Sequence, residues 1–143
     1  MSSAGSMRNF QISISDKLPK RKKLLMIMPL FTKPEPLKRP RLGQGRVYQP
    51  VDNLFGILTE MERFPPRYWK HPVIIDYFFM FNRKKKKETL HAKKPDLDNV
   101  IKAVNDCLTK VGIIYDDNQI VGMHAYKMYD VEDYMVLRIY EAG

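Results

Sequence analysis

Apolar residues recur in the C-terminal half of the chain at the three- and four-residue spacing of an amphipathic helix. The segment runs from about Leu97 to Lys110, with a carboxylate suited to cap its start at Asp96 or Asp98 and a glycine suited to end it at Gly112. This pattern predicts a helix over 97–110 that buries one face. The repeating apolar positions are Val100, Ile101, Val104, Cys107, Leu108 and Val111.

Other apolar segments have the composition or the alternation of β-strands. Residues 10–14 alternate between apolar and polar, which is typical of a half-buried strand, whereas 24–31 is continuously apolar and strand-sized. Residues 73–81 are rich in β-branched and aromatic side chains, so we expect a central strand there. Residues 120–129 and 134–140 are expected to form two antiparallel strands joined by a short acidic turn.

A second, shorter helix is predicted over residues 51–61 and ends before the consecutive prolines at 65 and 66. Basic segments at 33–50 and 83–94 are predicted to be irregular loops. The residues expected on the buried face of the short helix are Leu54, Phe55, Leu58 and Met61.

Strands and helices in this order, without regular alternation, indicate an α+β fold. We expect a single domain with a small mixed β-sheet packed with two or more helices. The domain is expected to cover residues 24–143, and residues 1–23 are expected to form a flexible basic extension.

Charge narrows the class of partner. The chain has 143 residues and a net charge of +9, from 25 Lys and Arg against 16 Asp and Glu. The cations occur in blocks, at 17–23, 38–46, 83–87 and 93–94, which a general need for solubility does not explain. No block continues into an amphipathic helix with an aromatic and leucine face, so nucleic acid is favoured over a membrane surface.

A single cysteine, Cys107, excludes an intrachain disulfide and fits a reducing compartment. No apolar run reaches the roughly 18 residues that a membrane-spanning helix needs. A soluble, cytoplasmic protein is therefore expected.

Two tight acidic groups stand out in this basic chain: Asp96 with Asp98, and Asp116 with Asp117. Clustered carboxylates repel one another unless a cation lies between them, and oxygen ligands suit hard divalent ions, chiefly Mg²⁺ or Mn²⁺. Each group also has a simpler interpretation, as a helix cap or as a turn, and the residues alone leave both open. Lys102, four residues after Asp98, is either a solvated helix partner or a cation directed at a phosphate.

The helix between the two acidic groups poses a geometric condition. A helix of this length extends about 21 Å, so its two ends cannot supply ligands directly to one ion. The acids can meet only if the chain after Gly112 turns back along the helix.

The segment from Lys94 to Val121 resembles the RusA family of Holliday junction resolvases, which is common in bacteria and prophages. The resemblance extends loosely over about residues 24–141. The positions that carry it are Asp96, Asp98, Asn99, Lys102, Asp106, Gly112, Asp116, Asp117, Gln119 and Val121.

This resemblance implies a magnesium-dependent homodimer that nicks two opposed strands of a four-way DNA junction in recombination and repair. By motif position, Asp96, Asp98 and Asp117 are the expected metal ligands and, with Lys102, the expected catalytic residues. The alternatives are a branched-DNA-binding protein without catalysis, or a nuclease that acts on forks or flaps.

The planar guanidinium group of arginine can donate two hydrogen bonds to the oxygens of one phosphate. The basic loop at 83–94, which precedes Asp96 and Asp98, could also lie along a DNA backbone. The residues expected to bind DNA are Arg39, Arg41, Arg46, Lys85, Lys86 and Lys94.

Overall fold

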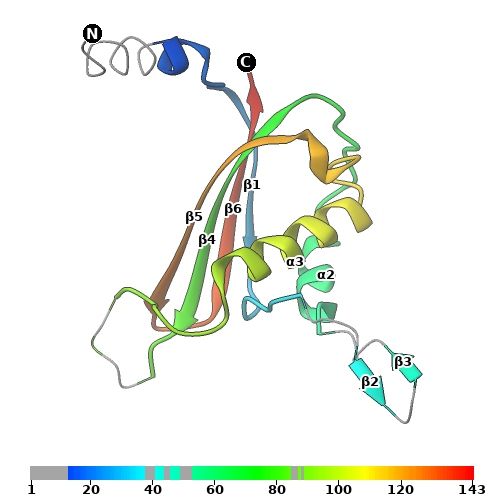
Figure 1. The fold of residues 1–143 in the computed structure, drawn as a ribbon, viewed down its shortest axis with the longest axis vertical. Helices are drawn as coiled ribbons and strands as arrows, with labels where there is room; N and C mark the ends of the chain where they lie inside the picture. The colour runs from blue at the N-terminus through cyan, green and yellow to red at the C-terminus, as the bar shows by residue number, and fades with distance from the viewer. Residues whose placement is uncertain (1–12, 38–40, 44–45, 49–52, 85–86, 88) are drawn as a thin grey trace, which may run out of the picture.

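The computed structural model describes residues 13–37, 41–43, 46–48, 53–84, 87 and 89–143, and of 41–43 and 46–48 it describes the backbone alone. A four-stranded sheet carries helices on one face (Figure 1). The elements are β1 (Arg21–Leu30), β2 (Arg41–Gly43), β3 (Arg46–Tyr48), α2 (Phe55–Met61), β4 (Val73–Asn82), α3 (Leu97–Lys110), the 3₁₀ helix η1 (Asp117–Gln119), β5 (Ile120–Asp130) and β6 (Tyr134–Ala142).

The sheet has the strand order β1-β6-β4-β5, which makes β4 a central strand as predicted. β4 pairs in parallel with β5 and antiparallel with β6, and β1 pairs antiparallel with β6. β5 and β6 therefore run in opposite directions, as expected, but they are not neighbours because β4 lies between them. The α+β class and the single mixed sheet are confirmed.

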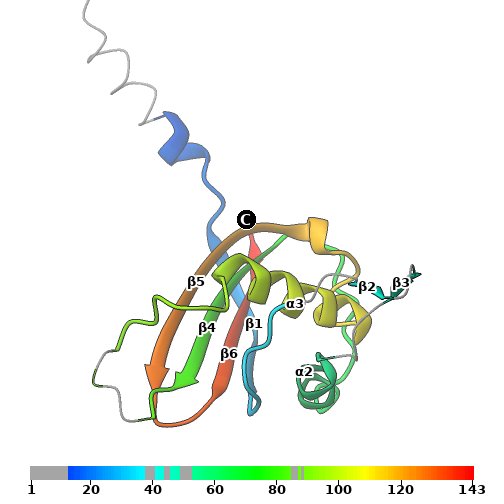
Figure 2. The same cartoon turned by 60° about the horizontal axis from the view of Figure 1, so that its bottom comes forward.

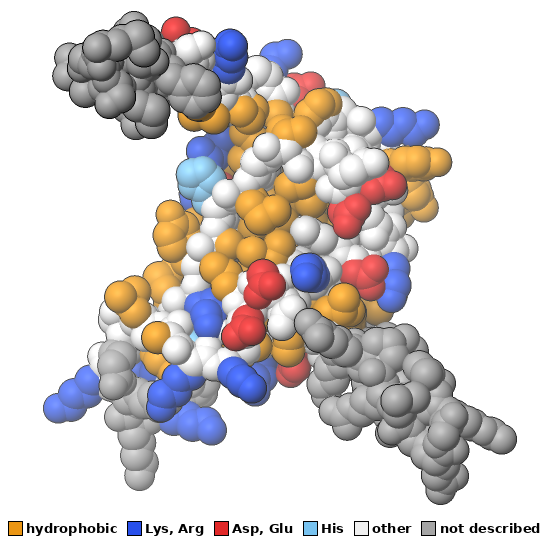
Figure 3. Space-filling model, in the orientation of Figure 1, with side chains coloured by type: hydrophobic (Ala, Val, Ile, Leu, Met, Phe, Trp, Pro, Cys, Tyr) orange, Lys and Arg blue, Asp and Glu red, His pale blue; other side chains and the backbone are white. Residues whose placement is uncertain are grey.

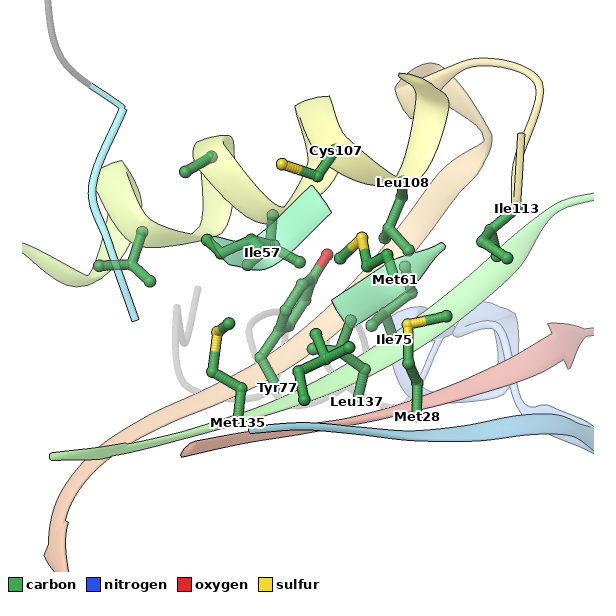
Figure 4. Packing of buried hydrophobic residues seen from close by; sticks show 14 of the residues in the cluster. Met28, Ile57, Met61, Ile75, Tyr77, Cys107, Leu108, Ile113, Met135 and Leu137 are labelled. Atoms are coloured by element: carbon green, nitrogen blue, oxygen red, sulfur yellow. The ribbon is translucent and has the colours of Figure 1, made fainter. Parts of the chain in front are cut away.

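α3 lies across one face of the sheet, and α2 lies beside it (Figures 1 and 2). The buried core fills the space between the helices and the sheet (Figure 4). Tyr77 of β4 reaches from the sheet toward α3 within this core, and Cys107 on the facing side of α3 is fully buried. Among the described residues, no helix is long and apolar enough to cross a membrane.

The long helix begins and ends where the apolar periodicity predicts. Asp96 is its N-cap residue, and Gly112 follows its last turn with a φ of 77°. A side chain at Gly112 would require an unfavourable left-handed backbone, and a Cβ there would lie 2.6 Å from the ring of Tyr68. The glycine therefore both ends α3 and lets Tyr68 pack against the turn.

Several local expectations were wrong. β1 begins at Arg21, three residues before the strand expected at 24–31. Ile14 lies in a helical turn rather than a strand, and residues 10–12 lie outside the described residues. Phe55 is 73% exposed, whereas Ile57 and Met61 form the buried face of α2. The segment expected to be irregular contains a small hairpin, β2–β3.

The sheet face opposite the helices contains a buried ion-pair centre. Asp76 of β4 is 3% exposed and accepts hydrogen bonds from Arg21 at 2.6 Å and from Arg138 at 3.3 Å. The rings of Phe78 and Tyr126 stack beside it with their centroids 5.8 Å apart. The two arginines on this face are thus committed to a protein carboxylate.

Candidate functional site

The solvent side of α3 carries a line of charged residues. Val100, Val104 and Leu108 turn inward, so Asp98, Lys102 and Asp106, each two positions before one of them, point away from the core. Figure 3 shows acidic side chains gathered along this helix and near η1, with basic ones between them. The Asp106 carboxylate also forms an ion pair with Lys110, at 3.1 Å.

The chain does turn back after Gly112. The Gly112 carbonyl accepts from the backbone amides of Arg67 and Tyr68, and the Tyr115 amide then donates to the Trp69 carbonyl. These bonds dock the returning segment on residues 67–69, beside the C-terminal half of α3. The return brings Asp116 and Asp117 to the level of Lys102 and Asp106.

A hollow of about 530 Å³ lies where these segments meet. α3 provides Lys102 and Asp106, and the returning segment provides Asp116 and Asp117. One cation and three carboxylates thus border one solvent-accessible space. We call this hollow the acidic pocket. Its remaining lining residues are Leu37, Asn105, Thr109 and Tyr115.

Gln119 holds the acidic turn in place. Its side-chain carbonyl accepts from the Asp116 amide at 2.7 Å, and its amide group donates to the carbonyls of Trp69 at 2.6 Å and His71 at 3.1 Å. The Asp116 carboxylate accepts from the Asn118 amide at 3.0 Å, which completes a capping box on η1. The glutamine therefore fixes the turn to the segment before β4.

The two adjacent carboxyl groups shift each other's pKa in opposite directions. The backbone amide of Asn118, and next the hydrogen bond with Asp117, hold the pKa of Asp116 below its ordinary value. That same shared bond is the main cause that raises the pKa of Asp117, and the negative charges of Asp116 and Asp106 add to it. Asp117 is thus the carboxyl group of this pair that holds a proton more tightly.

Asp96 lies in a different hollow, of about 390 Å³, at the other end of α3. Its neighbours there include Lys33, Glu35, Lys94 and Asn99. The helix rise separates Asp98 from Asp106 by about 12 Å along the axis. Over the described ranges of the chain, no three His, Cys, Asp or Glu side chains lie close enough to hold a metal ion.

The types of side chain suit a bound metal ion, but their positions within one chain do not bring them together. Carboxylate oxygens are the ligands that Mg²⁺ and Mn²⁺ prefer. However, one chain does not gather Asp96, Asp98 and Asp117 around a single point: it brings Asp117 to Lys102 and leaves Asp96 at the far end of the helix.

A profile of the family described as "Endodeoxyribonuclease RusA" matches residues 34–140. The chain belongs to this RusA family. A protein of Lactococcus phage r1t named crossover junction endodeoxyribonuclease rusA is 33% identical over 67 residues, which cover 47% of this chain and 51% of that protein. The aligned part thus spans about half the length of this relative.

Three residues of the family motif have structural roles although they were not expected to bind a metal. They are Asp106, Gly112 and Gln119. In the structure, Asp106 borders the acidic pocket, Gly112 allows the turn and Gln119 pins it. The spacing of these residues after Asp98 marked them as part of the motif, but it did not reveal that Gly112 and Gln119 shape the turn.

The residues expected to bind DNA are only partly covered. Arg39, Lys85 and Lys86 lie outside the described residues. Arg41 and Arg46 pair through their backbones with Tyr48 and Gly43 in the β2–β3 hairpin. Lys94 is exposed and borders the hollow that holds Asp96.

Proposed function

We propose that this chain is a structure-specific endodeoxyribonuclease that resolves four-way DNA junctions by paired symmetric nicks, in recombination and repair. The observation that carries the proposal is the acidic pocket, where Lys102, Asp106, Asp116 and Asp117 meet within the family's motif segment. Carboxylates beside a lysine, on a molecule with a net charge of +9, suit a phosphodiester substrate.

We further propose that Asp96, Asp98 and Asp117 hold Mg²⁺, with Mn²⁺ able to substitute. The bound ion would polarise the phosphoryl oxygen and lower the pKa of a bound water. Lys102 lies on α3 between Asp98 and Asp106, where its ammonium can neutralise charge that develops on the phosphate. Because the pKa of Asp117 is raised, an ion bound there would compete with a proton as the pH falls.

A homodimer resolves the geometric problem at α3. In a two-fold pair, a helix that crosses its copy in antiparallel fashion places the start of one beside the end of the other. Asp96 and Asp98 of one protomer could then approach Asp117 of its partner. Met123 supports a partner on this side, because it pairs with the core residue Ile75 and is nevertheless 45% exposed, and nearby Val121 is 48% exposed.

Cleavage of a synthetic four-way junction with Mg²⁺ tests the activity. We expect wild type to cut two opposed strands, and Asp98→Asn to lose cutting while still binding the junction, because the loss of a negative charge does not weaken phosphate contacts. Equal cutting by both proteins would refute the assignment of Asp98. Junction binding without cutting by wild type would identify a non-catalytic branched-DNA-binding protein, and preferential cutting of forks or flaps would identify a different nuclease.

Mixing two inactive variants tests the shared site. If each site takes Asp98 from one protomer and Asp117 from its partner, a heterodimer of Asp98→Asn and Asp117→Asn has one site with both carboxylates intact. Co-refolded mixtures should then nick one strand of the junction, whereas either variant alone should not. Inactive mixtures, with heterodimers verified by mass, would place all three carboxylates in one protomer.

A further inference from the structure

A third hollow, of about 320 Å³, opens at the end of the sheet where β4 and β5 finish, and its lining is strongly cationic. Three separate segments supply the charges: Lys33 follows β1, Arg83 and Lys84 follow β4, and Lys93 and Lys94 precede α3. We call this hollow the basic pocket. Its acidic lining residue is Asp133.

The five cations have few compensating charges in the described part of the chain. The ion pairs there are those of Arg21, Arg63, Lys110 and Arg138, and none involves the basic pocket. Asp133 uses one carboxylate oxygen to accept from the Asn82 amide, at 2.8 Å. Asp130, which lies near Arg83, accepts from Tyr134 and from the Val131 amide. Like charges gathered in this way repel one another unless an anion joins them.

Hydrogen bonds hold the backbone segment that carries Lys93 and Lys94. The Lys127 ammonium donates to the carbonyls of Lys93 and Pro95, both at 2.7 Å, and the Lys93 amide donates to His91 Nδ1 at 3.3 Å. The His91 ring lies between the rings of Phe81 and Tyr129, with centroids 4.4 Å and 4.6 Å away. The backbone at Lys93 and Lys94 therefore requires little further ordering when a ligand binds.

Lys84 is held in an unusual backbone conformation. Its φ is 53°, in the left-handed region that a lysine rarely adopts, and its amide donates to the Asn82 side-chain carbonyl at 2.7 Å. Strain of this kind persists only where the surroundings enforce it. Here it directs the chain so that Lys84 lines the pocket beside Arg83.

The basic pocket adjoins the hollow that contains Asp96. Both hollows are lined by Lys33, Lys94 and Pro95. A polyanion seated among the five cations would therefore continue directly toward the start of α3, past Glu35 and Asn99. A nucleic acid strand, with one phosphate for each 3.4 Å of helix axis, has the repeating charge that such a track requires.

We propose that the basic pocket binds consecutive backbone phosphates of one DNA strand and delivers that strand to Asp96 and Asp98. This inference rests on the proposed function for the role of the two carboxylates. It assigns phosphate contacts to Lys33, Arg83, Lys84 and Lys93, and it makes the pocket a positioning site for the strand.

The test compares two triple variants that remove the same charge. The pocket variant is Lys33→Gln, Lys84→Gln and Lys93→Gln. The control, Lys17→Gln, Lys20→Gln and Lys23→Gln, removes three exposed lysines from the other end of β1. Both are made in the Asp98→Asn background, so that binding to a four-way junction and to duplex is measured without cleavage across a series of salt concentrations.

We expect the pocket variant to bind DNA on the order of tenfold to a hundredfold more weakly near 0.1 M salt, with a salt slope reduced by about 2 to 3. The control should change the slope by less than one. Inorganic phosphate, titrated alone, should bind far more weakly than DNA because one ion engages few of the cations. Equal losses in both variants, or tight binding of inorganic phosphate with unchanged DNA affinity, would overturn the inference.

Two further measurements separate this inference from the proposed function. At low salt, the pocket variant should have a higher melting temperature than its parent, because repulsion among the cations is relieved, and this also verifies that it folds. Wild type that binds DNA through the pocket but never cuts would leave the inference standing and refute the nuclease. Normal cutting by the same three glutamine substitutions placed in a chain that keeps Asp98, with unchanged binding by the pocket variant, would do the reverse.

Discussion

The hydroxyl of Tyr77 links the hydrophobic core to the face of α3 that carries the acidic pocket. Tyr77 is fully buried, and burial raises the pKa of its hydroxyl far above the ordinary value. The hydroxyl donates to the Asn105 side-chain carbonyl at 2.6 Å, and Asn105 in turn borders the acidic pocket. The neutral Tyr77 hydroxyl therefore holds Asn105 in place from the core side of α3.

Removal of that hydroxyl should destabilise the protein modestly. We expect Tyr77→Phe to lower the free energy of unfolding by about 1 kcal/mol, because one buried hydrogen bond is lost while the ring stays in place. Urea denaturation measures the change. Tyr134→Phe is the matched control, since its partner Asp130 can be hydrated, and it should have a smaller effect. A larger loss in the control would contradict the role given to Tyr77.

The paired carboxyl groups predict opposite dependences of stability on pH. The pKa of Asp117 is raised, so its contribution to stability is present at low pH and is lost as pH rises through that pKa. Asp117→Asn should therefore raise the melting temperature by about 1–2 °C at neutral pH, an effect that screening keeps small and that disappears in acid. Thermal unfolding between pH 3 and pH 7 measures it.

Asp116 provides the contrasting variant for the same measurement. Its lowered pKa means that its contribution is present at neutral pH and is lost on acidification. Asp116→Ala should accordingly lower the melting temperature at neutral pH, with a difference that shrinks toward pH 3. If both variants shift the melting temperature at neutral pH in the same direction, the opposite pKa shifts of Asp116 and Asp117 are refuted.

Among the elements, α3 was predictable because its signals are local. Apolar spacing, an acid at its start and a glycine after it lie within one segment, and the observed bounds agree with them. The pairing of β5 was not predicted, because it depends on contacts between distant segments. A strand, a helix and a strand in sequence are typical of a parallel crossover, and that order was present at 73–81, 97–110 and 120–129.

The candidate site was predictable to a similar, limited extent. Carboxylates beside a lysine were visible as residue types, and the return of the chain after Gly112 was recognised as a condition. The extent of that return was not, because the backbone bonds of Gly112 and Tyr115 to residues 67–69 fix it. The dense motif therefore identified the residues but not the distances between them.

The short helix η1 gives a prediction about the turn that carries Asp117. Gln119→Ala should lower the free energy of unfolding by about 1–2 kcal/mol, because the Asp116 amide and the Trp69 and His71 carbonyls lose a partner. Junction cleavage should fall as well, since the turn is no longer pinned. Asn118→Ala is the control, because the Asn118 side chain is exposed. Equal losses in both variants would show that the contacts of Gln119 are not what matters.

At the scale of the whole molecule, charge is divided between surfaces. The sheet face opposite the helices pairs its two arginines with Asp76, whereas the basic pocket leaves its cations uncompensated by ion pairs within the described ranges. The five cations of the basic pocket therefore concentrate positive charge at the end of the sheet beside α3. Such a field would guide a polyanion to one side of the protein and would weaken with added salt.

The pairing of β1 with β6 has a consequence for how the protein is made. β1 is the first strand of the sheet and its partner β6 is the last, so the register from Arg21 to Leu30 can form only after residues 134–142 have left the ribosome. Until then β1 has no partner in the sheet, and one edge of β4 is open to pairing with other chains. A stop codon just before Tyr134 should therefore yield an aggregated and inactive product. Sedimentation of freshly translated chains measures the aggregation.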